Sequence, residues 1–270
     1  MLASRALLAK NVAAVLTSQP SCSFFQSSDV GNWGNANVAV VFSGSGCWDG
    51  TDTNEAAYVM YHLSRNGAKF QMFAPNMQQM QVIDHSRNQP SSGENRNVMI
   101  ESARLARGKI QDLSRLEAGN FDAIIFPGGY GITKNLSTFN NDGKDCRVNS
   151  DVERILKDFH RKNKPIGLSC TSPILACRAI PGIEVTMGQE REESGRWGRW
   201  PYYSMTNAVK TMGAKHVMKE PFISFSKPSH VDEKNKVIST PAFMWETESH
   251  YHYIFDGIGQ MVKHVLRMTK

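Results

Sequence analysis

The stretch KPIGLSC (164–170) runs directly into TSPILACRAI (171–180), and this junction decides the fold. The first stretch is apolar, as expected of a buried strand, and the second has the composition of a helix with Pro173 in its first turn. A strand that passes into a helix without a spacer makes a sharp elbow. A side chain on such an elbow projects at the carboxyl edge of the sheet, where open α/β folds bind their ligands. Cys170 occupies this position.

Strand and helix patterns alternate on both sides of the elbow. Short apolar runs predict strands at 37–43, 69–74, 121–126, 164–169, 216–219, 222–226 and 236–241. Segments 55–67 and 150–163 have the apolar spacing of helices, and a long amphipathic helix is expected from about 246 to 268. Because this alternation implies a mostly parallel sheet covered on both faces, we predict an α/β fold with one domain over residues 34–270.

The first 33 residues have the composition of a mitochondrial transit peptide. Arg5 and Lys10 stand among Ser, Ala and apolar residues, and no acidic residue precedes Asp29. A disordered N-terminus without a targeting role is the alternative. We exclude residues 1–33 from the fold and expect the protein in the mitochondrial matrix.

Composition argues against several classes of protein. No apolar run reaches the roughly 18 to 20 residues of a membrane-spanning helix, so no membrane span is expected. The net charge of +6 comes from scattered Lys and Arg, which does not favour nucleic-acid binding. The five cysteines, with Cys22 in the presumed presequence, form no CxxC pair and no metal-ligand spacing with histidine. We therefore expect free thiols, no metal and no cofactor.

Three features of the sequence point to chemistry at the elbow. The helix N-terminus after Cys170 is expected to lower the pKa of its thiol, although a small buried hydrophobe is the alternative. Gly128 and Gly129 end the strand at 121–126 and, with the N–H of Thr171, are candidates for an oxyanion hole, although a plain strand-end turn explains them too. Glu55 begins the helix after the first strand and is either a carboxyl partner of the thiol or a helix-start carboxylate capped by Asn54 or Thr53.

Longer motifs resemble a known family. VAVVFSGSGCWDGTDTNEA (38–56), FPGGYGITKNLSTF (126–139), KPIGLSCTSPILA (164–176) and VISTPAFMWETESHYHYIFDGIGQMV (237–262) are similar, in order, to the mitochondrial ES-one proteins. These are glutamine amidotransferase-like domain proteins related to bacterial ElbB, within the superfamily of PfpI-type proteases, deglycases and glyoxalases. The resemblance runs from about Asn37 to the C-terminus.

The resemblance implies a flavodoxin-like three-layer sandwich that forms a homodimer. It implies Cys170 as the nucleophile, Glu55 as its carboxyl partner, and Gly129 and Thr171 as oxyanion donors. ElbB-like relatives are associated with a weak, cofactor-independent glyoxalase activity, in which a thiolate adds to a small α-oxoaldehyde.

The chain departs from the superfamily at the general base. Glutaminases carry a His-x-Glu pair after the elbow, and PfpI-type proteins often place His just after the cysteine or within two dozen residues. This chain has Thr171 and Gly188 at those places. No base is therefore identified by the resemblance.

Other residues are weaker candidates for the pocket. His85, in the long insertion between Pro75 and Asn120, is the best histidine substitute if that insertion folds over the site, although a surface turn is the alternative. Glu101 and Arg107 fit an anionic-substrate pocket or a solvated helix face equally well. His250 and His252 are expected on different helix faces, so a shared metal site is not expected.

Cys47, in the loop after the first strand, is a candidate resolving thiol that pairs with Cys170 on oxidation. Two functions remain open from the sequence. One is a lyase or hydrolase acting on small reactive carbonyls through Cys170; the other is a non-catalytic or redox-sensing mitochondrial factor. A glutaminase is not favoured, because the His-x-Glu pair and a synthetase domain are both missing from the sequence.

Overall fold

A seven-stranded sheet forms the centre of the computed structural model, which describes residues 33–220 and 228–270. Its order is β12-β13-β7-β6-β1-β2-β5, and every neighbouring pair is parallel except β12 with β13. The strands are β1 (Asn37–Val41), β2 (Lys69–Ala74), β5 (Ile110–Asp112), β6 (Ala123–Phe126), β7 (Ile166–Ser169), β12 (His230–Asp232) and β13 (Val237–Thr240). The predicted α/β class with a mostly parallel sheet is confirmed.

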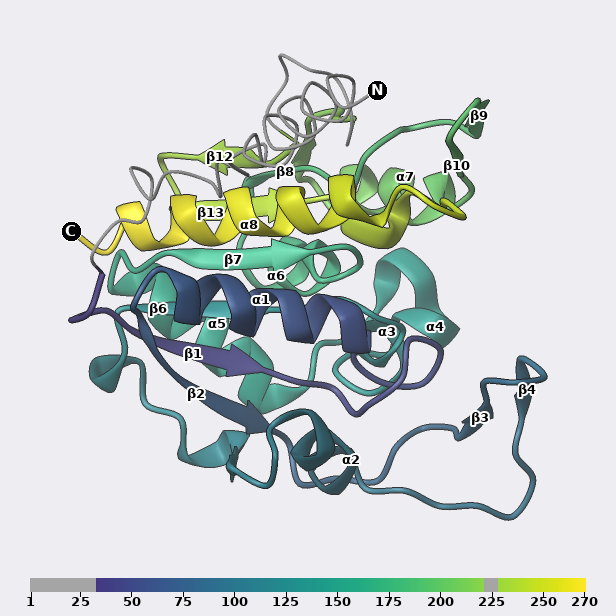
Figure 1. The fold of residues 1–270 in the computed structure, drawn as a ribbon, viewed down its shortest axis with the longest axis horizontal. Helices are drawn as coiled ribbons and strands as arrows, with labels where there is room; N and C mark the ends of the chain where they lie inside the picture. Colours follow the sequence, from purple (N-terminus) through teal and green to yellow (C-terminus); the bar gives the residue numbers. More distant parts are fainter. Residues whose placement is uncertain (1–32, 221–227) are drawn as a thin grey trace, which may run out of the picture. The chain divides into compact units, whose positions relative to one another are not determined.

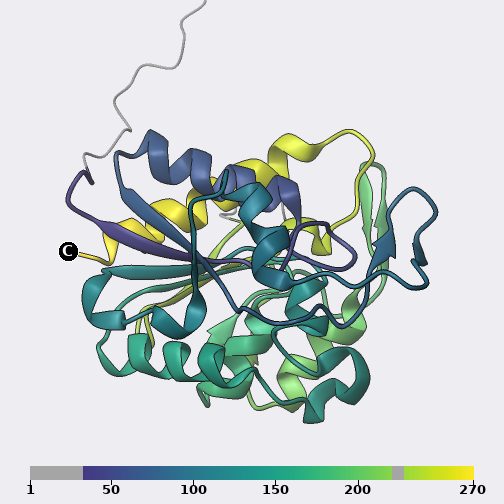
Figure 2. The same cartoon turned by 90° about the horizontal axis from the view of Figure 1, so that it is seen from below.

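Helices cover both faces of this sheet, as Figures 1 and 2 show. Helices α1 (Thr53–Arg65) and α8 (Tyr251–Arg267) pack side by side on one face, and α5 (Ser150–Arg161) and α6 (Pro173–Ala179) lie on the other. The remaining helices are α2 (Val98–Leu105), α3 (Gly131–Lys134), α4 (Phe139–Asp142) and α7 (Tyr203–Thr211). The result is the predicted three-layer arrangement.

The core is built from the apolar runs of the sequence. Strands β6, β7 and β13 are buried along their whole length, as expected of central parallel strands. Helix α5 turns its apolar stripe inward, and Asn149 caps its first turn by accepting from two backbone N–H groups. Its four buried residues share one face, as the apolar spacing predicted: Val152, Ile155, Leu156 and Phe159.

Smaller elements lie outside the seven-stranded sheet. The long insertion carries the hairpin β3 (Ile83–Asp84) and β4 (Gln89–Pro90) before α2. After the elbow come the hairpin β9 (Glu193–Gly195) and β10 (Gly198–Trp200) and the parallel pair β8 (Glu184–Val185) and β11 (Lys215–His216). None of the helices in the described ranges is long and apolar enough to cross a membrane.

Some predictions need correction or fall outside the structure. The C-terminal helix begins at Tyr251 and not near 246, because Glu246 pairs with Arg199 of β10 through two backbone hydrogen bonds of 2.9 Å. The expected transit peptide, apart from Trp33, and the strand expected at 222–226 lie outside the described residues.

Candidate active site

Cys170 stands on the predicted elbow between β7 and α6. Its φ is +55°, a left-handed conformation that costs a non-glycine residue roughly 1 to 3 kcal/mol and tends to occur at functional sites. Its N–H donates to the carbonyl of Thr240 on β13 at 3.0 Å, which fixes the turn. Pro173 begins α6 three residues later, as the sequence predicted.

Gly128 allows the cysteine and the glutamate to approach each other. A Cβ atom at Gly128 would lie 2.4 Å from Cys170 Cβ and 2.9 Å from Glu55 Oε2, so a larger residue does not fit. The N–H of Gly128 donates to Glu55 Oε2 at 2.7 Å and to Ser169 Oγ at 3.2 Å. Gly128 is therefore not an oxyanion donor, which corrects the prediction, because its N–H already serves the carboxyl group.

Glu55 is fully buried at the start of α1, and its carboxyl group faces the elbow. Its Oε2 also accepts a hydrogen bond of 2.5 Å from the hydroxyl of Ser169, while Oε1 has no hydrogen-bond partner within the described ranges. Burial, and secondly the charge of Asp52, raise the pKa of Glu55 to about 7, against the opposing hydrogen bonds from Ser169 and Gly128. The helix cap is Asp52, not Asn54 or Thr53.

The pKa of the Cys170 thiol is higher than the sequence predicted. Only 7% of the residue is exposed, and burial, followed by the charges of Glu55 and Asp52, raises its pKa well above the ordinary value. One hydrogen bond, from the N–H of Gly129, acts in the opposite direction. The predicted lowering by the helix terminus is outweighed, because two carboxyl groups and an apolar surrounding oppose the thiolate.

A cavity of about 750 Å³ opens over this group. The predicted site residues in its wall are Cys47, Glu55, Gly129, Cys170 and Thr171. Six aromatic side chains complete much of the wall: Trp48, Tyr130, Trp197, Tyr202, Phe243 and Tyr251. The β9–β10 hairpin and the segment before α8 thus supply much of the cavity wall.

Cys47 shares this cavity with Cys170. Burial, followed by the charges of Asp52 and Asp49, raises the pKa of the Cys47 thiol to about 11, so the thiol is protonated at neutral pH. A role as a resolving thiol stays a prediction.

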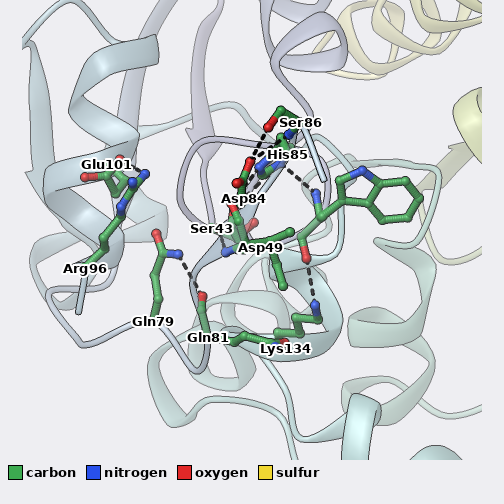
Figure 3. Close-up of polar contacts among 12 residues, drawn as sticks. Ser43, Asp49, Gln79, Gln81, Asp84, His85, Ser86, Arg96, Glu101 and Lys134 are labelled. Carbon is green, nitrogen blue, oxygen red and sulfur yellow. Dashed lines mark hydrogen bonds and ion pairs between the residues drawn. The ribbon is translucent and has the colours of Figure 1, made fainter. Parts of the chain in front are cut away.

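His85 does not line the cavity, which corrects the expectation of a base from the insertion. Its Nδ1 hydrogen-bonds with the carbonyl of Ile83 at 3.0 Å, and its Nε2 accepts from the N–H of Trp48 at 3.2 Å (Figure 3). Because both ring nitrogens bond to backbone groups, His85 has a structural role and connects the insertion to the loop after β1.

Glu101 and Arg107 also lie away from the cavity. Glu101 is buried and forms ion pairs with Arg96 at 3.5 Å and Arg104 at 3.2 Å, the first of which is drawn in Figure 3. Arg107 is exposed in the turn after α2, at a φ of +52°. Neither residue is placed to bind a ligand at Cys170.

Sequence reasoning missed the opposite wall of the cavity. Tyr202 donates from its hydroxyl to Glu246 Oε1 at 2.5 Å, and Arg199 Nε donates to Glu246 Oε2 at 2.7 Å. Tyr130 packs edge-on against Tyr202, with ring centroids 6.4 Å apart. The signal for this wall was the tryptophan- and arginine-rich stretch GRWGRWPYY (195–203), whose position over Cys170 depends on long-range pairing.

Among the described residues, His250 is the histidine that lies in the cavity wall. Its Nδ1 hydrogen-bonds with Ser249 Oγ at 3.0 Å, and its ring stacks on Tyr253 at 6.0 Å. In the ranges that the structure covers, no cluster of three or more His, Cys, Asp and Glu is arranged to hold a metal ion.

Comparison with known proteins decides the family. Over an alignment of 273 residues the chain is 66% identical to "ES1 protein, mitochondrial" of Danio rerio, covering 100% of this chain and 99% of that protein. This chain belongs to the ES1 family. A human ES1 relative, "Glutamine amidotransferase-like class 1 domain-containing protein 3, mitochondrial", is 57% identical over 234 residues, 87% of this chain and 84% of that one. No protein-family model matches the chain.

Solved structures share the fold of this chain. An isoprenoid biosynthesis protein with an amidotransferase-like domain from Ehrlichia chaffeensis has a TM-score of 0.74 at 31% identity, over 87% of this chain and 100% of that one. Rapid Encystment Protein 24 KDa of Francisella tularensis shares the fold, with a TM-score of 0.53 at 15% identity, over 87% of this chain and 99% of that one. The predicted family and flavodoxin-like fold are confirmed. The names of the ES1 relatives support a mitochondrial location.

Proposed function

We propose that this amidotransferase-like protein is a cysteine-dependent glyoxalase that converts small α-oxoaldehydes into hydroxy acids. The observation that carries the proposal is the buried pair of Cys170 and Glu55 in one cavity wall, with the N–H of Gly129 directed at the sulfur. A carboxyl group with a pKa of about 7 is suited to exchange protons at neutral pH.

The reaction begins with proton transfer from the thiol. The thiol proton of Cys170 moves to the free Oε1 of Glu55 as the sulfur adds to the aldehyde carbon. The N–H groups of Gly129 and Thr171 stabilise the oxyanion that forms, and Glu55 returns its proton to that oxygen to give a hemithioacetal. The hemithioacetal then isomerises to a thioester by two proton shifts. The proton on the former aldehyde carbon moves to the neighbouring carbon, and the proton on its hydroxyl oxygen moves to the neighbouring oxygen, with Glu55 as the carrier between the two oxygens. Water hydrolyses the thioester, releasing the hydroxy acid and the thiol.

The test is consumption of methylglyoxal and appearance of lactate. Cys170→Ala is expected to fall to the rate of the protein-free control, because the nucleophile is gone. Glu55→Gln is expected to lose about 100-fold in kcat, the usual contribution of an acid–base group. Cys146→Ala, a buried cysteine outside the cavity, is the matched control and is expected to keep the wild-type rate. Equal rates for wild type and Cys170→Ala would contradict the proposal.

We further propose that residues 34–270 work as one domain in the mitochondrial matrix and form a homodimer. The support for the location is the mitochondrial naming of the ES1 relatives, together with the composition of residues 1–33. The single domain is supported by the one compact unit that residues 32–270 form, and the homodimer by the family resemblance.

A further inference from the structure

The hydroxyl of Ser169 is hydrogen-bonded to the carboxyl group of Glu55. Ser169 is the last residue of β7, directly before Cys170, and its side chain is fully buried. Its Oγ donates to Glu55 Oε2 at 2.5 Å and accepts from the N–H of Gly128 at 3.2 Å. Ser169 does not line the cavity, so it can act on a ligand only through its neighbours.

The two oxygens of the Glu55 carboxyl group have different surroundings. Oε2 accepts from the Ser169 hydroxyl at 2.5 Å and from the N–H of Gly128 at 2.7 Å, whereas Oε1 has no hydrogen-bond partner among the described residues. The N–H of Gly128 can only donate, and in the part of the chain that the structure describes the Ser169 hydroxyl has no acceptor besides Oε2. Both donors therefore point their protons at Oε2, and a proton that Glu55 takes up lies on Oε1.

Cys170 lies close to this carboxyl group. A Cβ atom at Gly128 would lie 2.4 Å from Cys170 Cβ and 2.9 Å from Glu55 Oε2, so the elbow and the carboxyl group surround the same point. Cys170 and Glu55 also line the same cavity. Because two donors occupy Oε2, Oε1 is the oxygen available to the thiol proton.

We propose that Ser169 is a positioning residue, which holds Glu55 through Oε2 so that Oε1 exchanges the proton with Cys170. Its catalytic consequence rests on the proposed glyoxalase function. The S–H bond breaks as the sulfur forms its bond to the aldehyde carbon, and the proton goes to Oε1. Ser169 keeps its own proton throughout, and its hydrogen bond stabilises the carboxylate that accepts the thiol proton.

The charge of Glu55 depends on this hydrogen bond. Burial, and secondly the charge of Asp52, raise the pKa of Glu55 to about 7, and the hydrogen bond from Ser169 opposes that rise. Among the described residues, the titratable groups that act on Glu55 are Asp52 at the cap of α1 and Cys170 on the elbow. Both stay in place when the Ser169 hydroxyl is removed. The pKa of Glu55 should then rise further, which leaves less carboxylate to accept the thiol proton at acidic pH.

The experiment compares Ser169→Ala with Ser172→Ala as the matched control. Ser172 is also fully buried near the elbow, but its Oγ donates to the carbonyl of Pro127 at 3.1 Å and not to Glu55. Two quantities are measured on the full chain between about pH 6 and pH 9. The first is kcat/KM for lactate formation from methylglyoxal. The second is the infrared absorption of the protonated Glu55 carboxyl group, identified as the band that Glu55→Gln lacks, and it requires no activity.

Ser169→Ala is expected to raise the midpoint of the Glu55 titration by about one pH unit. Its kcat/KM should fall about tenfold at pH 6 and stay within about twofold of wild type at pH 9. Ser172→Ala should keep the wild-type midpoint. An unchanged midpoint in Ser169→Ala overturns the proposal, and so does a loss of kcat/KM by the same factor at every pH, which would reflect a general structural effect. If wild type forms no lactate, the proposed function fails, while the infrared midpoints still decide whether Ser169 controls Glu55.

Discussion

At the scale of single residues, the buried Glu55 makes the stability of the protein depend on pH. Its pKa in the folded protein is about 7, above the ordinary value of 4.5. The folded state therefore binds this proton more tightly than the unfolded state does. The free energy of unfolding falls as pH rises from about 4.5 to about 7, and the loss is complete above that window.

Glu55→Gln is expected to remove this loss, because an amide resembles the protonated acid. We compare the free energy of unfolding of the variant with that of wild type at each pH. This difference should be more favourable to the variant at pH 8.5 than at pH 4.5, by on the order of 3 kcal/mol. Chemical denaturation at the two pH values measures the difference. An equal effect of the substitution at both pH values would show that Glu55 titrates normally in the folded protein.

Asp52 offers a second test of the electrostatics at the elbow. Its charge raises the pKa of both Cys170 and Glu55, while its Oδ1 accepts the N–H groups of Asn54 and Glu55 as the cap of α1. Asn is an equally good cap. Asp52→Asn is therefore expected to keep the helix and to speed iodoacetamide alkylation of Cys170 severalfold at pH 8, because the thiol pKa falls.

Asp49→Asn is the matched control for that measurement. Asp49 is also buried in the loop before α1. Its carboxylate, however, accepts the N–H of Ile83 at 2.7 Å and lies 3.9 Å from His85 Nε2. The alkylation rate of Cys170 should stay unchanged in this variant. Faster alkylation in both variants would attribute the effect to a loosened loop, not to charge.

The site residues whose positions depend on local sequence could be predicted. Those whose positions depend on contacts with distant parts of the chain could not. The positions of Cys170 and Gly129 could be predicted because each lies at the end of a strand that a short apolar run of sequence reveals. The partnership of Tyr202 with Glu246 joins residues 44 positions apart, and no local pattern contains it. The direction of the Cys170 pKa shift was predicted wrongly for the same reason, since burial and the approach of Glu55 arise only on folding.

At the scale of elements, the β9–β10 hairpin is the part of the site most dependent on close packing. A Cβ atom at Gly198 would lie 2.3 Å from the carbonyl oxygen of Glu246 and 2.5 Å from the ring of Trp245. At Gly195, in the same hairpin, the nearest atom is 3.9 Å away. Neither glycine has a positive φ, so the two substitutions differ in the room available for a Cβ atom and not in backbone strain.

Gly198→Ala is expected to push the hairpin away from Glu246 and to lower stability by about 2 kcal/mol, as overpacking does. Hydrogen exchange should increase over residues 193–200, and iodoacetamide should reach Cys170 faster. Gly195→Ala should behave like wild type in both measurements. If hydrogen exchange of the hairpin is unchanged in Gly198→Ala, the segment around Glu246 can move to make room for the added methyl group.

Elements were predictable where the apolar pattern alone decides them. The four central strands and α5 were found from runs of valine, isoleucine and leucine that are buried in the structure. The start of α8 was not, because helical spacing continues through residues 246–250 while pairing with β10 holds Glu246 extended. Pairing with a distant hairpin thus overrides a local preference for helix.

At the scale of the whole molecule, the relatives named mitochondrial agree with the presequence expected from composition. Residues 1–33 fused to a fluorescent protein are expected to enter mitochondria, because Arg5 and Lys10 supply positive charge on an apolar segment that lacks acidic residues before Asp29. Arg5→Glu with Lys10→Glu reverses that charge at the same length and should leave the fusion in the cytosol. Equal import of both fusions, scored by protease protection in isolated mitochondria, would mean that charge in this segment does not direct the protein. Import of neither would place the signal after residue 33, within the part of the chain that also builds the sheet.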